Sequence, residues 1–364
     1  MRRLSRSVAL GIVLCATLVS IGTAPAASAA EPGVHAHLLW SRMTSATVER
    51  DLDRLKAIGV EYVRVDVGWS SLESKGRGQI SSWYLERIDH LVAEANQRGL
   101  ELLLTFTETP CWASSAPDSL RQNCAGSWWE RSVQRYPPRD AAEYARALAF
   151  LVGRYGDRVA AWEVWNEPNH PDYLKGGNQV AEYAAILRAA YPAAKAAHAS
   201  AVIVGGSLAG SDFEFTEALF ARGIRDHFDA WSIHPYSEDR SPLDPWLDAY
   251  VKNSFIRGIP AVRQTLVEHG DAAPMWLTEF GWSTCTVRNQ PEAYKNCVSE
   301  TRQAEWLKQA YRQMREWPYV RVGVWYNAQD KSEDLSHKSD NFGLRRYDGS
   351  RKPAYWAYRG MFGP

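Results

Sequence analysis

The sequence predicts an α/β fold, a single-domain (β/α)8 TIM barrel, and three observations lead to that prediction. Short apolar runs alternate with longer amphipathic stretches, eight of each, over residues 31–364, as in such a barrel. No linker, low-complexity tract or block of like charge interrupts this region. The first run is not followed by the glycine-rich phosphate-binding turn that a doubly wound open sheet normally carries.

The predicted strands are the short apolar runs. In order they are Gly33–Leu39, Tyr62–Val67, Glu101–Thr107, Ala160–Asn166, Val202–Gly206, Ala230–His234, Met275–Thr278 and Val322–Tyr326. The predicted helices are the amphipathic stretches between and after them. In order they are Ala46–Ala57, Trp83–Arg98, Ala141–Tyr155, Gln179–Ala199, Phe213–Arg222, Ser254–His269, Glu300–Glu316 and Ala354–Met361.

Side chains alternate along a strand, which assigns the residues of each predicted strand to two faces. In the second strand the valines share one face, while Tyr62, Arg64 and Asp66 share the other. In the sixth strand His234 and Tyr236 share a face. Because the active sites of these barrels lie at the C-terminal ends of the strands, we expect these polar side chains to meet there.

Residues 1–30 are predicted to be a secretory signal peptide. They combine arginines near the start, an apolar run and small residues at Ala26–Ala30 that suit signal peptidase. Cys15 lies inside this segment and is expected to be removed with it. We therefore predict a secreted domain over residues 31–364, with no membrane insertion after cleavage, that acts as a monomer.

The charge balance excludes one class of partner. The full chain has 42 basic and 42 acidic residues. The predicted signal holds three arginines and no acid, which leaves 39 basic against 42 acidic residues in the remainder. Nucleic-acid binders carry a basic stripe, so no nucleic-acid partner is expected. The 16 tryptophans favour a carbohydrate partner, because indole faces pack against sugar rings.

Four cysteines remain after the predicted signal, and an even number in an exported protein predicts disulfides. Sequence alone allows three pairings. We favour the two local ones, Cys111–Cys124 and Cys285–Cys297, each closing a short loop that is worth about 3 kcal/mol in the chain-entropy model. Zinc binding is disfavoured because the cysteine spacings do not match structural zinc sites.

Two glutamates end two predicted strands, each among aromatic residues. Glu167 lies in Trp165-Asn166-Glu167-Pro168-Asn169, and Glu279 lies in Met275–Trp282. Glycoside hydrolases use two carboxyl groups that face the same site. One protonates the leaving oxygen, and the other attacks the anomeric carbon. A retaining enzyme predicts a separation of about 5 Å between them, and a separation beyond about 6.5 Å would indicate inversion.

The chain resembles the retaining glycoside hydrolases of clan A, most closely glycoside hydrolase family 39. That family's signature reads W-x-F-E-x-W-N-E-P-[DN], and Glu163–Asn169 fit it, while Ala160 and Trp162 depart from it. Asn341–Leu344 and the residues that follow also resemble the family's final hairpin and helix. A family 5-like endo-glycanase stays open as the alternative, although the end of the third strand lacks the histidine that family 5 members often carry.

The resemblance implies a role for each site residue. Glu167 would be the acid/base and Glu279 the nucleophile. Asn166 would bind the sugar 2-hydroxyl, and Arg64 would keep the nucleophile ionised. His234 would orient the acid/base, Tyr236 would contact the nucleophile, and Trp325 would form the floor of the sugar site. No cofactor is implied.

Two further predictions concern loops and the first strand. The long segment after the third strand carries Trp112, which we expect to contact substrate. His35 and His37 form the H-x-H pattern with which metal-dependent amidohydrolase barrels begin their metal site, but the fifth strand offers no further histidine. We therefore expect no metal and assign His37 to a sugar hydroxyl. A barrel that binds carbohydrate without cleaving it is the other alternative.

Overall fold

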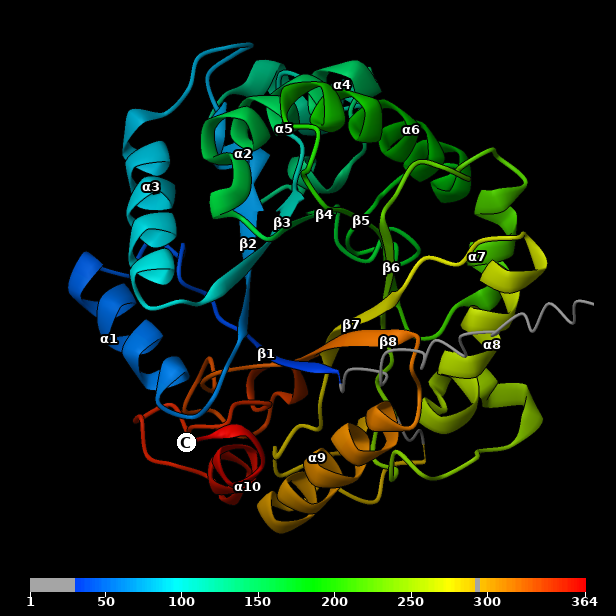
Figure 1. Ribbon diagram of the computed structural model, residues 1–364. Coiled ribbons are helices and arrows are strands. Elements are labelled where there is room, and N and C mark those ends of the chain that lie inside the picture. Colours follow the sequence, from blue (N-terminus) through cyan, green and yellow to red (C-terminus); the bar gives the residue numbers. More distant parts are fainter. Residues whose placement is uncertain (1–29, 292–294) are drawn as a thin grey trace, which may run out of the picture.

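The computed structural model describes residues 30–291 and 295–364. The predicted signal peptide, with Cys15, therefore lies outside the described residues except for Ala30. Within the described part, eight parallel strands close into a barrel in the order β1 to β8 (Figure 1). They are β1 Glu31–His35, β2 Tyr62–Gly68, β3 Glu101–Thr107, β4 Ala161–Val164, β5 Ile203–Ala209, β6 Ala230–His234, β7 Met275–Phe280 and β8 Val320–Trp325.

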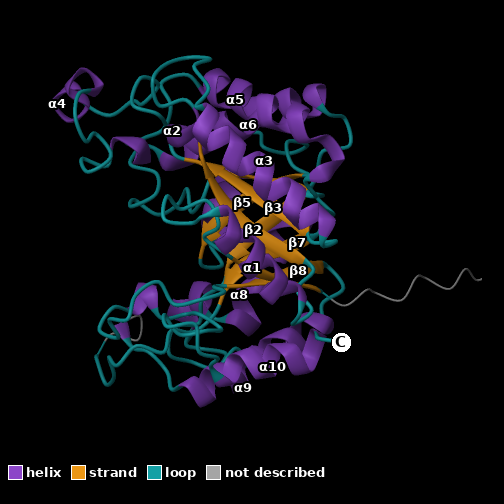
Figure 2. Ribbon diagram, turned by 90° about the vertical axis from the view of Figure 1, so that its left-hand side faces the viewer, coloured by secondary structure: helices purple, strands orange, loops and turns teal. Residues whose placement is uncertain are grey.

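Helices surround this barrel (Figures 1 and 2). In the described residues they are α1 Ser45–Lys56, α2 Trp69–Leu72, α3 Ser82–Gln97, α4 Asp118–Arg121, α5 Ala141–Tyr155, α6 Gln179–Ala197, α7 Phe213–Phe220, α8 Phe255–Glu268, α9 Glu300–Arg315 and α10 Pro353–Phe362. The predicted TIM-barrel fold is confirmed. The short helices α2 and α4 were not predicted, because each has only one turn and too few residues to show a helical period.

Capping side chains decide where several helices begin. Thr44 accepts a hydrogen bond from the backbone nitrogen of Thr47 at the start of α1, and Ser81 does the same for Tyr84 in α3. Such a cap satisfies a backbone donor that the first helical turn leaves free. The observed starts therefore precede the predicted ones by one residue in both helices.

The strand ends beside the barrel mouth differ most from the prediction. Strand β4 stops at Val164, because Trp165 and Glu167 have positive φ angles of 70° and 44° that extended backbone does not allow. Strand β5 continues to Ala209 through an irregular register near Gly206, whose φ is 97°. Only glycine reaches such a φ without strain.

The core has two shells. Inside the barrel, near the starts of the strands, a cluster joins residues from most strands: Leu103, Ala161, Val204, Ala230, Trp276, Val322 and Val324. Between the strands and the surrounding helices lies the larger cluster, which contains the buried side of nearly every helix. The inner cluster fills the barrel near the N-terminal ends of the strands, and the polar strand ends lie at the opposite end.

Strand β8 turns its valines into the barrel. Val322 and Val324 belong to the inner cluster. Gly323 faces α9, since a β-carbon there would lie 2.6 Å from the sulfur of Met314. Trp325 therefore points outward into the core between barrel and helices, and Tyr326 points toward the barrel axis. Trp325 therefore does not form the floor of the sugar site that the family resemblance implied.

Both predicted disulfides are present. Cys111 and Cys124 are joined, with 5.6 Å between their α-carbons, and Cys285 and Cys297 are joined, with 5.4 Å. Each closes a loop on the same end of the barrel as the C-terminal strand ends. In the described residues, we find no helix with the length and apolar character needed to span a bilayer.

Candidate active site

The two predicted catalytic glutamates meet at the C-terminal ends of the strands. A carboxylate oxygen of Glu167, after β4, lies within 4.8 Å of a carboxylate oxygen of Glu279, at the end of β7. The long loops of the molecule gather at this end of the barrel, as the side view shows (Figure 2). The pair therefore sits in the position where barrel enzymes carry out chemistry.

Glu279 is held as an anion. Nη1 of Arg64 donates to Oε1 of Glu279 at 2.5 Å, and the hydroxyl of Tyr236 donates to Oε2 at 2.7 Å. Burial alone would raise the pKa of this carboxyl, but His234 and Arg64 outweigh it and lower the pKa to about 2. An ionised carboxylate with fixed oxygens is the form that a nucleophile needs.

Glu167 is held by different neighbours. Its backbone nitrogen donates to the carbonyl of Ser207, and Nδ1 of His234 lies 2.9 Å from its Oε1. The burial of His234 would lower its pKa, but the charges of Glu279 and Glu167 raise it above the ordinary value. His234 thus fixes the position of Glu167 and places a proton donor beside it.

Arg64 connects four strands beneath these carboxyls. It is completely buried, and its guanidinium donates to Glu163 at 2.8 Å and to the side-chain oxygen of Asn166 at 2.8 Å, besides Glu279. Nη1 also lies 2.8 Å from Nδ1 of His35. The pKa of Arg64 is raised, because Glu163 and Glu279 outweigh its burial. Two carboxylates around one buried guanidinium satisfy its fork of donors, which fixes the side chain rigidly.

The cleft around the two glutamates has two arms that share Tyr173, Glu279 and Tyr326. One arm extends past Asn166 and His37, the other past Glu167 and Tyr236. These lining residues include the predicted Asn166, His37 and Tyr236. The structure thus brings those three side chains to the same cleft as the glutamates.

Two predicted substrate contacts lie elsewhere. Trp325 is fully buried and lies against Phe280 and Trp282, and its indole nitrogen donates to the carbonyl of Phe342. The indole nitrogen of Trp112 donates to the carbonyl of Glu73, and neither indole lines either arm of the cleft. Trp325 is enclosed in the core, so the expected contact between its indole and a sugar does not hold, whereas the sugar contact of the partly buried Trp112 stays a prediction.

Tyr326, Tyr173 and Glu108 line the cleft and were missed in the sequence. Tyr326 directly follows Trp325, the residue to which the family resemblance gave the floor of the sugar site. Tyr173 is in the loop after β4, where no period reveals direction. Glu108 follows β3 with a positive φ of 67°, and its carboxylate accepts from the hydroxyl of Ser70 at 2.6 Å. Burial raises the pKa of Glu108. Its place directly after a strand was the available indication.

His35 and His37 lie beside Asp66 at the rim of the cleft. Nε2 of His35 lies 3.2 Å from Nδ1 of His37 and 3.3 Å from Oδ2 of Asp66. Burial and the neighbouring His35 lower the pKa of His37 to about 3. His35, His37 and Asp66 each offer one ligand atom, and these atoms lie within 4.8 Å of one another.

Comparison with known proteins assigns the family. A sequence model described as cellulase, glycosyl hydrolase family 5, matches residues 23–330. The family 5 alternative, which the missing histidine disfavoured, is thus supported. The predicted membership of the clan A glycoside hydrolases is confirmed, and this match leaves the amidohydrolase-type barrel without support.

Similar proteins also support the predicted likeness to family 39 within clan A. A family 39 glycoside hydrolase from Bacteroides cellulosilyticus superposes with a TM-score of 0.71 at 22% identity, over 92% of this chain and 63% of that one. A β-glucosidase from an Agrobacterium species is 31% identical over 33% of this chain and 23% of that protein. A cyanidin 3-O-glucoside 5-O-glucosyltransferase (acyl-glucose) from Dianthus caryophyllus is 23% identical over 54% of this chain and 39% of that protein. This chain therefore spans less than half of either curated relative.

Proposed function

The chain belongs to the cellulase family, glycosyl hydrolase family 5, and on that premise we propose that it is a secreted enzyme that hydrolyses β-glycosidic bonds of a poly- or oligosaccharide with retention. The observation that carries the proposal is the carboxylate pair, Glu167 and Glu279, with oxygens within 4.8 Å of each other. Retaining enzymes hold their carboxyl groups about 5 Å apart, whereas inverting enzymes leave room for a water between them. The β configuration is taken from relatives such as the β-glucosidase.

In the first step Glu279 attacks the anomeric carbon, and Glu167 protonates the departing oxygen. A glycosyl–enzyme ester forms on Glu279 as the C–O bond to the leaving group breaks. Arg64 and Tyr236 hold Glu279 with both oxygens hydrogen-bonded, which fixes the direction of attack. His234 holds Glu167 beside the leaving oxygen.

In the second step a water replaces the leaving group. Glu167, now ionised, takes a proton from this water, and the resulting oxygen attacks the anomeric carbon. Glu279 leaves as a carboxylate, and two inversions give net retention. Asn166, whose oxygen is occupied by Arg64, keeps its amide nitrogen as the donor for the 2-hydroxyl of the sugar.

We further propose that the protein is secreted and monomeric. The two disulfides are typical of proteins that fold in an oxidising compartment, which supports export directed by residues 1–30. Residues 31–364 are proposed to form one catalytic domain that works as a monomer. Size-exclusion chromatography with light scattering measures this state directly.

The stereochemistry of the first product tests the mechanism. With a 4-nitrophenyl β-glycoside panel covering glucose, xylose, mannose and galactose, we expect proton NMR to detect the β-anomer of the released sugar before mutarotation. An initial α-anomer would show inversion and would contradict the double displacement.

Chemical rescue separates the two glutamates. We expect Glu279→Ala to lose activity by about 10⁴-fold or more, and azide to restore turnover by forming an α-glycosyl azide. In Glu167→Ala the same azide should give the β-glycosyl azide, since Glu279 still acts as nucleophile. Unchanged turnover in either variant, or the same azide anomer from both, would overturn the assigned roles.

A further inference from the structure

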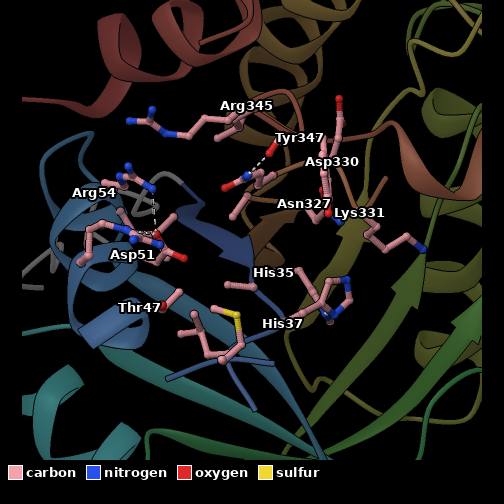
Figure 3. A pocket seen from close by; sticks show the side chains of 18 of the residues that line it. His35, His37, Thr47, Asp51, Arg54, Asn327, Asp330, Lys331, Arg345 and Tyr347 are labelled. Carbon is pink, nitrogen blue, oxygen red and sulfur yellow. Dashed lines mark hydrogen bonds and ion pairs between the residues drawn. The ribbon is translucent and has the colours of Figure 1, made fainter. Parts of the chain in front are cut away.

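A separate cavity lies beside the barrel mouth, between the loop after β1, helix α1 and the loop after β8 (Figure 3). Its volume is about 360 Å³, which is within the range of small-molecule pockets. His35 and His37 line this cavity and also the arm of the cleft next to Glu279. The two spaces therefore share these histidines as a common wall.

One end of this cavity carries excess positive charge. Arg42, Arg50, Arg54 and Arg345 line it, and Asp51 lies among them. Asp51 is already bonded to Arg54 at 3.0 Å and to Arg50 at 3.3 Å. The chain as a whole has equal numbers of basic and acidic residues, so this excess is local.

Arg345 and Arg42 are the two of these four that form no ion pair with a described carboxylate, and Arg345 is the less exposed of them. Its guanidinium donates to the carbonyl of Gly349 at 2.9 Å and lies 4.6 Å from the ring centre of Tyr355. Among the residues that the structure describes, no carboxylate forms an ion pair with it. Burial and the nearby charges of Arg54 and Arg351 lower its pKa. Figure 3 shows Arg345 and Arg54 reaching the same side of the cavity.

The other end of the cavity has buried polar groups without partners. Asn327 is only 1% exposed, and neither the nitrogen nor the oxygen of its side-chain amide has a hydrogen-bond partner. Nε2 of His37 is also buried without a partner. An amide and an imidazole left unpaired in this way are costly to a folded protein unless a ligand completes their hydrogen bonds.

We propose that this cavity is a subsite for an acidic sugar residue of the substrate, with its carboxylate between Arg54 and Arg345 and its hydroxyls toward Asn327 and His37. The inference rests on the proposed function, because it assumes a glycan in the adjoining cleft. A planar guanidinium pairs with a carboxylate through two parallel hydrogen bonds. The half-exposed ring of Tyr347, also in the wall, offers an apolar face to the sugar ring.

Sugar binding to a variant that cannot turn over tests this proposal. With Glu279→Gln, isothermal titration calorimetry compares methyl β-D-glucuronide with methyl β-D-glucoside, which differ only in a carboxylate for a hydroxymethyl group. We expect the glucuronide to bind about tenfold more tightly or better, and the difference to shrink as salt rises. Adding Arg345→Gln or Arg54→Gln should abolish the difference.

Arg359→Gln is the matched control, because Arg359 is exposed on α10 and does not line the cavity. It should keep the preference for the glucuronide. Thermal unfolding shows whether each variant is folded. If Arg345→Gln is not folded, Arg54→Gln alone tests the subsite.

Glucose 6-sulfate and glucose 6-phosphate are titrated in the same way as further anionic sugars. Preference for either of these without preference for the glucuronide would overturn the carboxylate assignment. Equal binding of all sugars, or a preference that survives both arginine substitutions, would overturn the subsite. The proposed function is decided separately, by hydrolysis of aryl glycosides with the unaltered enzyme.

Discussion

The hydroxyl of Tyr236 is the neutral group that holds the nucleophile, and its removal isolates the effect of one hydrogen bond. It donates to Glu279 at 2.7 Å and helps lower the pKa of that carboxyl to about 2. In Tyr236→Phe we expect that pKa to rise. Because Glu279 reacts as an anion, activity should then begin to fall at a higher pH on the acid side.

The measurement is kcat/KM against pH on an aryl glycoside. A hydrogen bond to a charged group implies a loss of about tenfold to a hundredfold at neutral pH. Tyr191→Phe is the control, since its hydroxyl bonds Asp229 on the far side of the barrel. An unshifted acid limb in Tyr236→Phe would show that the hydroxyl does not hold Glu279 ionised.

Trp325 and Tyr326 are neighbours with opposite roles, and alanine substitutions separate them. Removing the buried indole of Trp325 should cost about 3–5 kcal/mol of unfolding free energy. Tyr326→Ala should keep most of the stability but raise KM or lower kcat, because its ring lines both arms of the cleft. Chemical denaturation and steady-state kinetics measure both. Equal stability losses with equal activity losses would contradict this division.

At the level of single residues, the sequence predicted the side chains that strand ends place directly. Glu167, Glu279 and His234 meet as expected because each follows a strand or lies at its end, and Arg64 joins them from the inward face of β2. The prediction for Trp325 failed because the alternation of side chains defines two faces of a strand but does not say which face points into the barrel. Only the packing of Gly323 against Met314 in α9 decides that, and this contact is invisible until the helix is placed.

At the level of elements, helices were predicted closely and the strand ends near the site were not. The difference is physical, since helix ends depend on local caps, whereas Trp165 and Glu167 take positive φ angles that only the assembled barrel supports. Glu167 is strained in this sense, and its backbone is held by Ser207 in the next strand. The irregular strand end is therefore part of how the acid/base is aimed.

The disulfides stabilise the loops around the cleft. Cys285–Cys297 closes a separation of 12 residues in the loop after β7, which directly follows the nucleophile. The double variant Cys285→Ser, Cys297→Ser should lose about 3 kcal/mol of stability in the chain-entropy model. Differential scanning calorimetry should record a lower Tm.

Reduction provides the internal control for this prediction. Dithiothreitol should lower the Tm of the unaltered protein further than that of the double variant, which retains only Cys111–Cys124. An unchanged Tm in the double variant would show that the loop after β7 is already held by its other contacts. Its backbone hydrogen bonds, such as Thr284 to Asn341, would then be sufficient.

At the level of the whole molecule, the eightfold alternation was predictable, while the basic cavity was not. The alternation repeats along the chain and needs no long-range information. The cavity joins α1 residues near position 50 to loop residues near position 345. These segments meet only because β1 lies beside β8 when the barrel closes.

Strand β1 closes the barrel. Strand β1 pairs with β2 on one side and with β8 on the other, and Gly33 lies so close to Val324 that a β-carbon would approach its Cγ2 to 2.9 Å. A protein beginning at Glu31 keeps this strand and should therefore unfold in one transition. A protein beginning at Ala36 lacks the closing strand, which exposes the edges of β2 and β8 and opens the inner cluster. We expect it to lose its near-ultraviolet circular dichroism and to aggregate. A folded, active protein without residues 31–35 would show that the remaining seven strands hold the site without closure.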